Sequence, residues 1–447
     1  MQVCESLLQK EQFIGQDTDD TLHFAFAKRL GTHARAEDFL LPEDCLQEAW
    51  EEKICLPGEA RERSAYLHIP FCRLRCTYCG FYKNHHEPLR SKRYVQTLIK
   101  DIKMSGQKAY CHEQPLKAVY FGGGTPGIMT PQEITQVLAA VKSNLTLADD
   151  CEITFETSVC DLDDEQFSAC LAGGVNRFSL GVQTFNTKIR QSLGRIDDEK
   201  RLRARLEELS TKQDQAAIVI DLIYGLPGQT LQLWQHDLDL AIGSGIHGLD
   251  TYSLNVQSSS ILAQQIKEGK MPAVAPRHEQ ADYFANAVET LHRNGLRRLS
   301  VCHWGRFDMK EQNVYNRMSK GAAGKIPFGA GAGGSLDGWR LRLCSDAEVY
   351  EQIVNEGKKP IQLMARPSAL YPVISSLKAC MDQGVLLTDN LPQNIQAALR
   401  PLLHKWEQRG FINSARGINE LTLAGQFWYG ELSQALVDYV QVNFYES

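Results

Sequence analysis

Cys72, Cys76 and Cys79 stand close together in the segment YLHIPFCRLRCTYCGFYKN, with the spacing CxxxCxxC. Cysteine thiolates are the usual ligands of iron–sulfur clusters. Three of them can bind three irons of a [4Fe–4S] cube and leave the fourth iron without a protein ligand. Structural zinc sites instead close with four Cys or His ligands. Because His85 and His86 follow the loop, spacing alone leaves zinc open as an alternative.

The overall composition predicts an ordinary cytoplasmic protein. The chain has 447 residues, 13 of them cysteine, and the cysteines outside the loop are scattered, as is typical of packing residues in a reducing compartment. A formal net charge of −6 argues against a dedicated nucleic-acid binder. The acidic start shows no signal pattern, and no run approaches the roughly 18 apolar residues of a membrane span. We therefore expect a cytoplasmic protein without a membrane span.

Strand and helix signals alternate around the cysteine loop. From about residue 64 to 256, β-rich runs such as SAYLHIP, AVYFGGG, EITFETS and RFSLGVQ alternate with segments whose apolar residues have helical spacing. Such alternation predicts βαβ units and a parallel sheet. Six consecutive units predict an α/β fold with a partial (β/α)6 barrel of TIM type. The active site of such a barrel lies at the C-terminal ends of the strands.

Four regions are expected along the chain. They are an N-terminal extension (1–60), the partial barrel (61–300), a glycine-rich substrate-side segment (301–355) and a C-terminal helical or winged-helix-like domain (356–447). The run FGAGAGGSLDG lets backbone approach a ligand or serves as a flexible connection. FINSARGINELTLAG predicts a small hairpin. The role of the extension is open, and covering the barrel mouth is one possibility.

The cysteine loop and its flanks resemble the radical S-adenosylmethionine (SAM) superfamily. The form YxHIPFCxxxCxYC is typical of its coproporphyrinogen III oxidase-like group, and residues 122–126 (GGGTP) are similar to the SAM-binding glycine loop of that group. The resemblance covers residues 64 to about 340. It implies a radical SAM barrel, a [4Fe–4S] cluster on the three cysteines and two SAM molecules in one site.

The same resemblance implies SAM contacts at successive strand ends. Glu156 is expected to accept from a SAM amino group, Asp221 to bind ribose hydroxyls and Arg195 to pair with a carboxylate. The full implied set is Tyr66, Tyr78, Gly123, Gly124, Thr125, Glu156, Gln183, Arg195, Asp221 and Asn255. Taken alone, each is an ordinary surface polar or core residue, and it is their convergence on one rim that favours a site. No further catalytic residue is assigned.

Two departures narrow the resemblance to one branch. Phe81 stands where coproporphyrinogen III oxidase has a further cysteine, and His303-Trp304 stand where heme chaperones have His-Asn. The segments VCHW, NVYNRM and FGAGAGGSLDG resemble the heme-utilisation (anaerobilin synthase) branch. That branch implies a class C methyltransferase that opens heme without oxygen, forms a methylated linear tetrapyrrole and releases iron. A heme chaperone and a coproporphyrinogen III oxidase-like dehydrogenase are the alternatives.

The implied reaction uses both SAM molecules. One gives a 5′-deoxyadenosyl radical, which takes hydrogen from the methyl group of the other, and the methylene radical adds to a meso carbon of heme. A flavodoxin or similar donor is the implied source of electrons, and a heme-delivery or product-accepting protein is a further expected partner. For heme itself, His303 is a candidate axial ligand, Trp304 an aromatic wall and Arg306 a propionate partner. The alternative is a locally hydrogen-bonded histidine and a solvated basic face.

Overall fold

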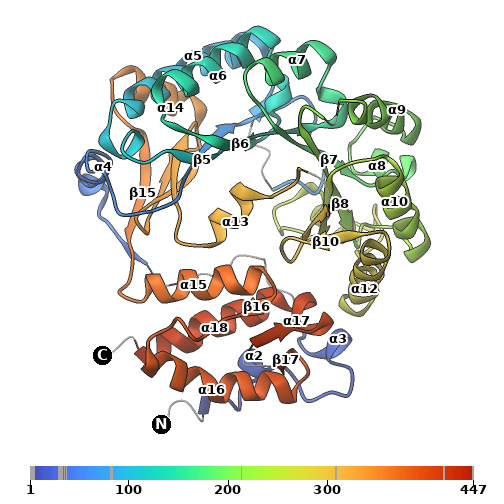
Figure 1. Ribbon diagram of the computed structural model, residues 1–447. Helices are drawn as coiled ribbons and strands as arrows, with labels where there is room; N and C mark the ends of the chain where they lie inside the picture. The colour runs from blue at the N-terminus through green and yellow to red at the C-terminus, as the bar shows by residue number, and fades with distance from the viewer. Residues whose placement is uncertain are drawn as a thin grey trace.

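The computed structural model describes residues 6–28, 34, 36, 38–80, 84–212, 214–307, 310–415 and 418–444. Within these residues, a mixed sheet of thirteen strands curves around the centre of the molecule, and a three-stranded sheet lies beneath it (Figure 1). A third pair, β3 (Phe71–Cys72) and β4 (Asn84–His85), runs along the base of the cysteine loop.

Six parallel strands form the core of the curved sheet and are neighbours in the order of the sequence. They are β2 (Arg63–Ile69), β5 (Leu116–Gly123), β6 (Leu147–Ser158), β7 (Arg177–Gln183), β8 (Ala217–Tyr224) and β9 (Gly248–Ser253). The connections carry helices α5 (Pro88–Gly106), α6 (Pro131–Asn144), α7 (Asp164–Ala172), α8 (Thr187–Ser192), α9 (Glu199–Ser210) and α10 (Leu231–Gly243), and short turns η2 (Ala109–Cys111), η3 (Pro126–Ile128) and η4 (Val159–Asp161). Figure 1 shows these helices on the outside of the arc. The expected partial barrel is confirmed.

Local sequence sets the points where the outer helices begin. In α6 the Thr130 hydroxyl accepts from the backbone N–H of Glu133, while the Glu133 carboxylate accepts from the N–H of Thr130 at 2.8 Å. Asp163 and Gln166 make the same reciprocal cap at α7. Such caps satisfy helix ends that have no partner within the helix. They fix each helix directly after a strand end, so the intervening loops lie along one rim.

Further strands extend the parallel core at both edges. Beside β2 the sheet continues with β12 (Gly324–Phe328), β13 (Gly333–Leu336), β14 (Trp339–Leu343), β15 (Ile361–Arg366) and β1 (Phe39–Leu40). Beside β9 it continues with β11 (His303–Arg306) and β10 (Leu296–Arg298). Of these, β12 runs parallel to β2, whereas β13, β14 and β15 run antiparallel to their neighbours.

The glycine-dense run FGAGAGGSLDG is a built part of this sheet. It spans the end of β12, a tight turn and β13. At Gly329 the backbone φ is 92°, a left-handed conformation that favours glycine. The Tyr94 hydroxyl anchors the turn, because it receives a 2.8 Å hydrogen bond from the N–H of Ala330 and donates a 2.7 Å bond to the carbonyl of His68. The run therefore joins the strand that carries the cysteine loop.

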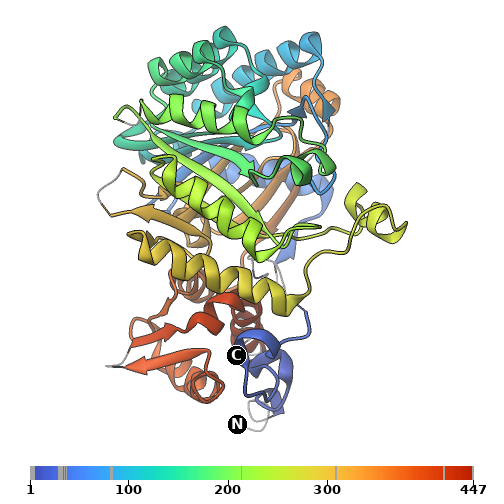
Figure 2. The same cartoon turned by 90° about the vertical axis from the view of Figure 1, so that its right-hand side faces the viewer.

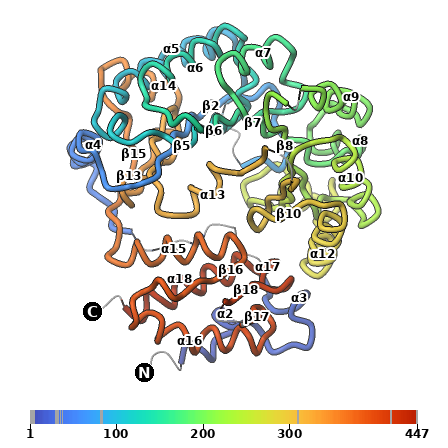
Figure 3. Tube along the Cα trace, viewed as in Figure 1, coloured from blue at the N-terminus to red at the C-terminus, as the bar shows by residue number. Residues whose placement is uncertain are grey.

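Helices inside and around the barrel complete this part. They are α4 (Leu46–Ile54) after the turn η1 (Glu43–Cys45), α11 (Ile261–Lys267), α12 (Arg277–Arg293), α13 (Val314–Lys320) and α14 (Ala347–Asn355). The trace in Figure 3 places α13 in the centre of the arc. There Tyr315 and Met318 of α13 pack against Ala118 of β5.

The C-terminal elements form the lower part of the molecule. They are α15 (Tyr371–Asp382), β16 (Val385–Leu386), α16 (Gln393–Gln408), β17 (Ile412–Ala415), β18 (Ile418–Leu421), α17 (Leu423–Phe427) and α18 (Tyr429–Phe444). The antiparallel pair β17–β18 is the expected hairpin. A three-stranded sheet with helices matches the winged-helix-like expectation in outline, while the four region boundaries stay predictions.

The N-terminal helices α2 (Glu11–Ile14) and α3 (Thr21–Phe24) pack on these C-terminal elements. The Trp406 indole donates to the carbonyl of Phe13 at 2.7 Å, and the Trp428 indole donates to that of Thr21 at 2.9 Å. Figure 2 shows both ends of the chain together below the barrel. This part of the extension therefore braces the C-terminal elements and does not cover the barrel mouth.

Candidate active site at the mouth of the barrel

The cysteine loop leaves the C-terminal end of β2 at the rim. Cys72 is buried, and Cys76 and Cys79 are partly exposed. The N–H of Cys79 donates to the carbonyl of Cys76 at 3.2 Å, which folds the second half of the loop into a turn. Two neighbours fix that turn: the N–H of Thr77 donates to Leu193 at 3.0 Å, and the N–H of Leu262 donates to Thr77 at 2.9 Å.

The surroundings of the thiols decide what this loop can bind. Burial, opposed in part by a hydrogen bond from Thr125, raises the pKa of Cys72 to about 11, and the other two thiols add to the shift. The Thr125 hydroxyl lies 3.4 Å from Cys72 Sγ. Arg195 interacts with Cys76 and Tyr78. Thiolates therefore need a cationic partner here, and an iron–sulfur cluster supplies one.

A mononuclear zinc site demands a different arrangement. Zinc ligands all lie about 2.0–2.3 Å from a single ion. Among the residues that the structure describes, no group of three or more His, Cys, Asp and Glu side chains converges in that way. In a cube each thiolate binds its own iron, so the sulfurs need not converge on one point. The donor set fits a [4Fe–4S] cluster, and Cys72, Cys76 and Cys79 stay predicted as its ligands.

The glycine loop after β5 owes its composition to close packing. A Cβ on Gly122 would lie 2.6 Å from Glu156 Oε2, and one on Gly124 would lie 2.6 Å from the carbonyl of Phe71. Gly123 has φ of 109°, and a Cβ there would lie 2.6 Å from the His68 ring. Gly123 and Gly124 thus bring β5 against the strand and loop that carry the cysteines, and Gly122 leaves room for the Glu156 carboxylate of β6. The sequence predicted that the glycines let the backbone approach a ligand. The structure shows that they also let strands of the barrel pack closely against one another.

Two of the expected SAM contacts are carboxyl groups inside the barrel. Glu156 and Asp221 are partly exposed, and burial is the main cause that raises the pKa of Glu156 to about 7 and that of Asp221 to about 8. The neighbouring Asp250 contributes to both shifts. The Ser179 hydroxyl lies 3.5 Å from Asp221 Oδ1. Near neutral pH both groups can accept or donate a hydrogen bond.

The other expected contacts divide between the barrel interior and the rim. Tyr66 faces the interior, with its hydroxyl 3.1 Å from His68 Nδ1. Arg195 donates to the carbonyl of Gly181 at 2.9 Å. Gln183 has φ of 71°, which turns the chain at the end of β7. At the rim Tyr78 packs beside Leu193 and Leu262 in a small apolar cluster, and Asn255 lies exposed just after β9. The SAM-contact roles of all these residues stay predictions.

His303 is tied into an ion-pair network, which contradicts its expected role as a heme ligand. Its Nδ1 lies 2.8 Å from Asp250 Oδ2, and its Nε2 lies 3.0 Å from Glu311 Oε1. Glu311 also accepts from Arg177 Nε at 2.9 Å. Although burial opposes it, the two carboxylates raise the pKa of His303 to about 10. An imidazolium carries a proton on each ring nitrogen and therefore offers no lone pair to iron.

Trp304 and Arg306 also lie away from the expected heme site. Trp304 is 1% exposed and packs edge-to-face on His292 of α12, on the outer side of the sheet. Arg306 donates to the carbonyls of Ile246 at 2.8 Å and Ile242 at 2.7 Å, before the start of β9. The cause is that β11 runs antiparallel to β9 and carries the chain away from the rim. Both heme assignments were therefore wrong.

Several polar residues of the barrel interior were missed by the sequence analysis. They are Tyr120, Arg177, Asp250, Glu311 and Tyr315. For Arg177 the signal was present in its strand, since polar or small residues alternate with buried apolar ones in RFSLGVQ. A period of two places alternate residues on one face. Glu311 and Tyr315 lie outside the strands, and no strand period could place them.

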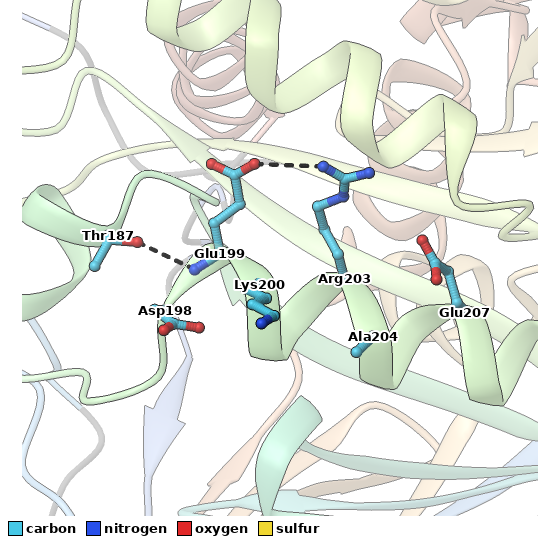
Figure 4. Close-up of a pocket in the computed structure, with 7 residues that line it drawn as sticks. All are labelled: Thr187, Asp198, Glu199, Lys200, Arg203, Ala204 and Glu207. Carbon is cyan, nitrogen blue, oxygen red and sulfur yellow. Dashed lines mark hydrogen bonds and ion pairs between the residues drawn. The ribbon is translucent and has the colours of Figure 1, made fainter.

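A separate hollow lies on the outer helix layer. Figure 4 shows it on α8 and α9, lined by Thr187, Asp198, Glu199, Lys200, Arg203, Ala204 and Glu207. Two of its charged residues form an ion pair along the helix, with Glu199 3.7 Å from Arg203. The Thr187 hydroxyl accepts from the N–H of Glu199 at 3.1 Å. This hollow is outside the barrel and takes no part in the site.

Comparison with known proteins agrees with this geometry. Residues 66–241 match the radical SAM superfamily. The chain is 36% identical over 398 residues to the anaerobilin synthase of Escherichia coli O157:H7, covering 89% of this chain and 88% of that protein. It is 31% identical over 294 residues to the heme chaperone HemW of Lactococcus lactis, covering 65% and 74%. The solved structure of E. coli coproporphyrinogen III oxidase (HemN) has a TM-score of 0.75 at 20% identity, covering 89% of this chain and 94% of that one.

A curved parallel barrel with a CxxxCxxC loop at its mouth defines a radical SAM protein. The chain belongs to the radical SAM superfamily and, within it, to the HemN-like group. Membership implies a [4Fe–4S] cluster and SAM. In the described part of the chain, no helix is both long and apolar enough to cross a membrane. Phe81, on which the sequence analysis relied to set aside coproporphyrinogen oxidation, lies outside the described residues.

Proposed function

We propose that this protein is a radical SAM methyltransferase that opens the porphyrin ring of heme without oxygen, giving a methylated linear tetrapyrrole and free iron. The observation that carries the proposal is the match to an anaerobilin synthase, which extends over 89% of this chain and 88% of that relative. The match to the heme chaperone of L. lactis covers 65% of this chain at 31% identity. The regions outside the shared barrel are thus common to this chain and the anaerobilin synthase.

Two SAM molecules in the mouth of the barrel are part of the proposal. When bound, the cluster and SAM supply the radical chemistry by which a SAM methyl group reaches a meso carbon of heme. The chain's own task is to hold and orient these groups. Cys72, Cys76 and Cys79 hold the cluster, and Arg195 and Thr125 stabilise the thiolates.

The interior carboxyl groups orient SAM in this proposal. Glu156 and Asp221 have pKa values raised to about 7 and about 8, so near neutral pH each is poised between donor and acceptor. Glu156 accepts a hydrogen bond from the amino group of SAM, and Asp221 binds the ribose hydroxyls of SAM. A positively charged SAM favours their ionised forms, because an opposite charge nearby lowers a carboxyl pKa. A flavodoxin-like donor in the cytoplasm supplies electrons, and a further protein delivers heme or accepts the product.

The test is anaerobic incubation of the reconstituted protein with heme, SAM and a reductant. We expect the Soret band of heme to disappear with time. The Cys76→Ala variant should lose iron from the cluster and leave heme intact, because two thiolates cannot hold the cube. Cys380→Ala is the matched control, since Cys380 lies on α15 away from the loop, and it should behave as wild type. A wild-type protein that binds heme and leaves it intact during SAM turnover would be a chaperone.

A further inference from the structure

Three lysines gather where α13, inside the barrel, contacts α15 of the C-terminal part. Lys320 ends α13, Lys325 lies on β12 and Lys378 lies on α15. All three are half-buried. Burial is the main cause that lowers the pKa of Lys325 and of Lys378, and the charge of Lys320 lowers both further. These residues form one electrostatic unit, called here the lysine group.

Two carboxylates of the described residues lie near the lysine group. Lys320 Nζ lies 3.9 Å from Asp382 Oδ1, which is at the limit of an ion pair. Asp38 raises the pKa of Lys378, against the effects of burial and of Lys320, and Lys378 Nζ donates to the carbonyl of Ala34 at 2.9 Å. Lys325 is the member of the group that forms no ion pair among the described residues. Uncompensated charge in such surroundings is costly, and a bound anion would relieve the cost.

Lys325 points into the barrel. It lies opposite Ser64 of β2 in parallel register, and Pro327 lies opposite Tyr66. Because alternate side chains share one face of a sheet, Lys325 lies on the same side as Tyr66. Its Nζ is 6.0 Å from the centre of the Tyr315 ring. Among the described residues, no carboxylate lies within ion-pair distance of Lys325, and its neighbours include the Tyr315 ring and the like charge of Lys320.

Three tyrosine rings lie in the barrel interior beside Lys325. The Tyr120 and Tyr315 rings are stacked, with centroids 4.5 Å apart and an interplanar angle of 27°. The Tyr66 ring lies 6.2 Å from Tyr120 and 6.3 Å from Tyr315. Tyr66 and Tyr120 are partly exposed. These three residues are called here the tyrosine wall. Along β2, the four steps from Ser64 to His68 span about 13 Å, which separates the lysine end from the rim.

We propose that the lysine group binds the two propionate carboxylates of a tetrapyrrole while its macrocycle lies against the tyrosine wall. The inference rests on the proposed function and names the subsite that orients the substrate. Half-buried ammonium groups form strong charge-assisted hydrogen bonds with carboxylates, and an apolar macrocycle gains by burial against aromatic rings. Both propionates lie on one edge of heme. Their binding at the lysine group turns the opposite edge toward the cysteine loop.

The test compares heme with its dimethyl ester, which keeps the macrocycle and loses both charges. The reconstituted protein is titrated anaerobically with each compound, and binding is followed by the Soret band. Wild type should bind heme more tightly than the ester. In Lys325→Met the affinity for heme should fall on the order of tenfold, while that for the ester stays unchanged. Lys320→Gln should act in the same direction.

The matched control is Lys117→Met, because Lys117 is on β5 and pairs with Asp150 at the surface. This variant removes the same charge and should bind both compounds as wild type does. Equal wild-type affinity for heme and ester would overturn the inference, and so would a Lys325 variant that keeps the wild-type preference for heme or loses both compounds equally. Heme consumption by wild type, measured on the same samples, reports on the proposed function separately. A protein that prefers heme over the ester and does not consume it would contradict only that function.

Discussion

At the scale of single residues, the barrel interior contains a buried network of charged side chains around His303. His303 lies between Asp250 at 2.8 Å and Glu311 at 3.0 Å, and Arg177 adds a second cation at 2.9 Å from Glu311. Two cations and two carboxylates thus form a buried network below Asp221. Removing one member of such a network leaves an uncompensated charge and typically costs about 3–5 kcal/mol. The network holds Asp250 in place, and the charge of Asp250 in turn raises the pKa of Asp221.

The pH dependence of stability reports on His303. Its pKa is raised from an ordinary value of 6.5 to about 10, so folding holds its proton more tightly. Its contribution to the free energy of unfolding is therefore complete below pH 6.5 and is lost as pH rises through 10. We expect His303→Gln to lower the melting temperature most near pH 6 and progressively less toward pH 10. Thermal unfolding by circular dichroism measures this.

The control for that series is His112→Gln, because His112 is exposed and forms no ion pair among the described residues. Its melting temperature should follow wild type at every pH. A difference between wild type and His303→Gln that stayed constant from pH 6 to pH 10 would show that His303 is not held as an imidazolium.

At the scale of elements, α13 is held inside the barrel by a strand residue. Glu152 of β6 is buried, and its carboxylate accepts from the N–H of Val314 at 2.9 Å and from that of Tyr315 at 3.0 Å. These bonds satisfy backbone groups at the start of the helix that have no partner within it. A negative charge also favours a helix N-terminus. Glu152 therefore positions the Tyr315 ring in the tyrosine wall.

Removal of that carboxylate should loosen α13. In Glu152→Ala the buried N–H of Tyr315 and the partly buried N–H of Val314 lose their acceptor. We expect this loss to cost about 1–3 kcal/mol of unfolding free energy. Heme affinity should fall as well, since Tyr315 loses its support. Urea unfolding and a heme titration measure the two effects. The control is Glu165→Ala, an exposed residue of α7. Wild-type stability and heme affinity in Glu152→Ala would contradict the positioning role.

At the scale of the whole molecule, the two ends of the chain stabilise one another. Phe13 of α2 is 2% exposed and packs edge-to-face on Tyr439 of α18, with ring centroids 6.2 Å apart. The Trp406 indole donates to the Phe13 carbonyl. The C-terminal part thus depends on residues that lie almost four hundred positions earlier. Its contact with the barrel runs through α12, α13 and α15.

Phe13→Ala should destabilise the C-terminal part more than the barrel. Loss of a buried phenylalanine typically costs about 3–5 kcal/mol. We expect limited proteolysis to cleave first between residues 367 and 444, while the barrel keeps its iron. Phe24→Ala is the control, because Phe24 is 53% exposed. Uniform cleavage across the barrel and the C-terminal part would contradict this division.

Much of this architecture follows from the sequence, and the rest depends on contacts between distant segments. The period-two and helical patterns predict the six βα units, because each strand is buried and each helix is amphipathic. The cysteine spacing and the glycine loop predict a cofactor site at the rim of the barrel. The heme assignment failed at His303, because Asp250 and Glu311 reach it only through strand pairing and the segment before α13. The lysine group was missed for the same reason, since its members come from α13, β12 and α15.

The central claim is that heme is opened by transfer of a SAM methyl group. The most direct measurement is mass spectrometry of the tetrapyrrole formed anaerobically from heme with SAM whose methyl group carries 13C. The account predicts a linear tetrapyrrole that contains one labelled carbon, together with free iron and loss of the Soret band. Intact heme after SAM turnover, or an open tetrapyrrole without the label, would contradict it.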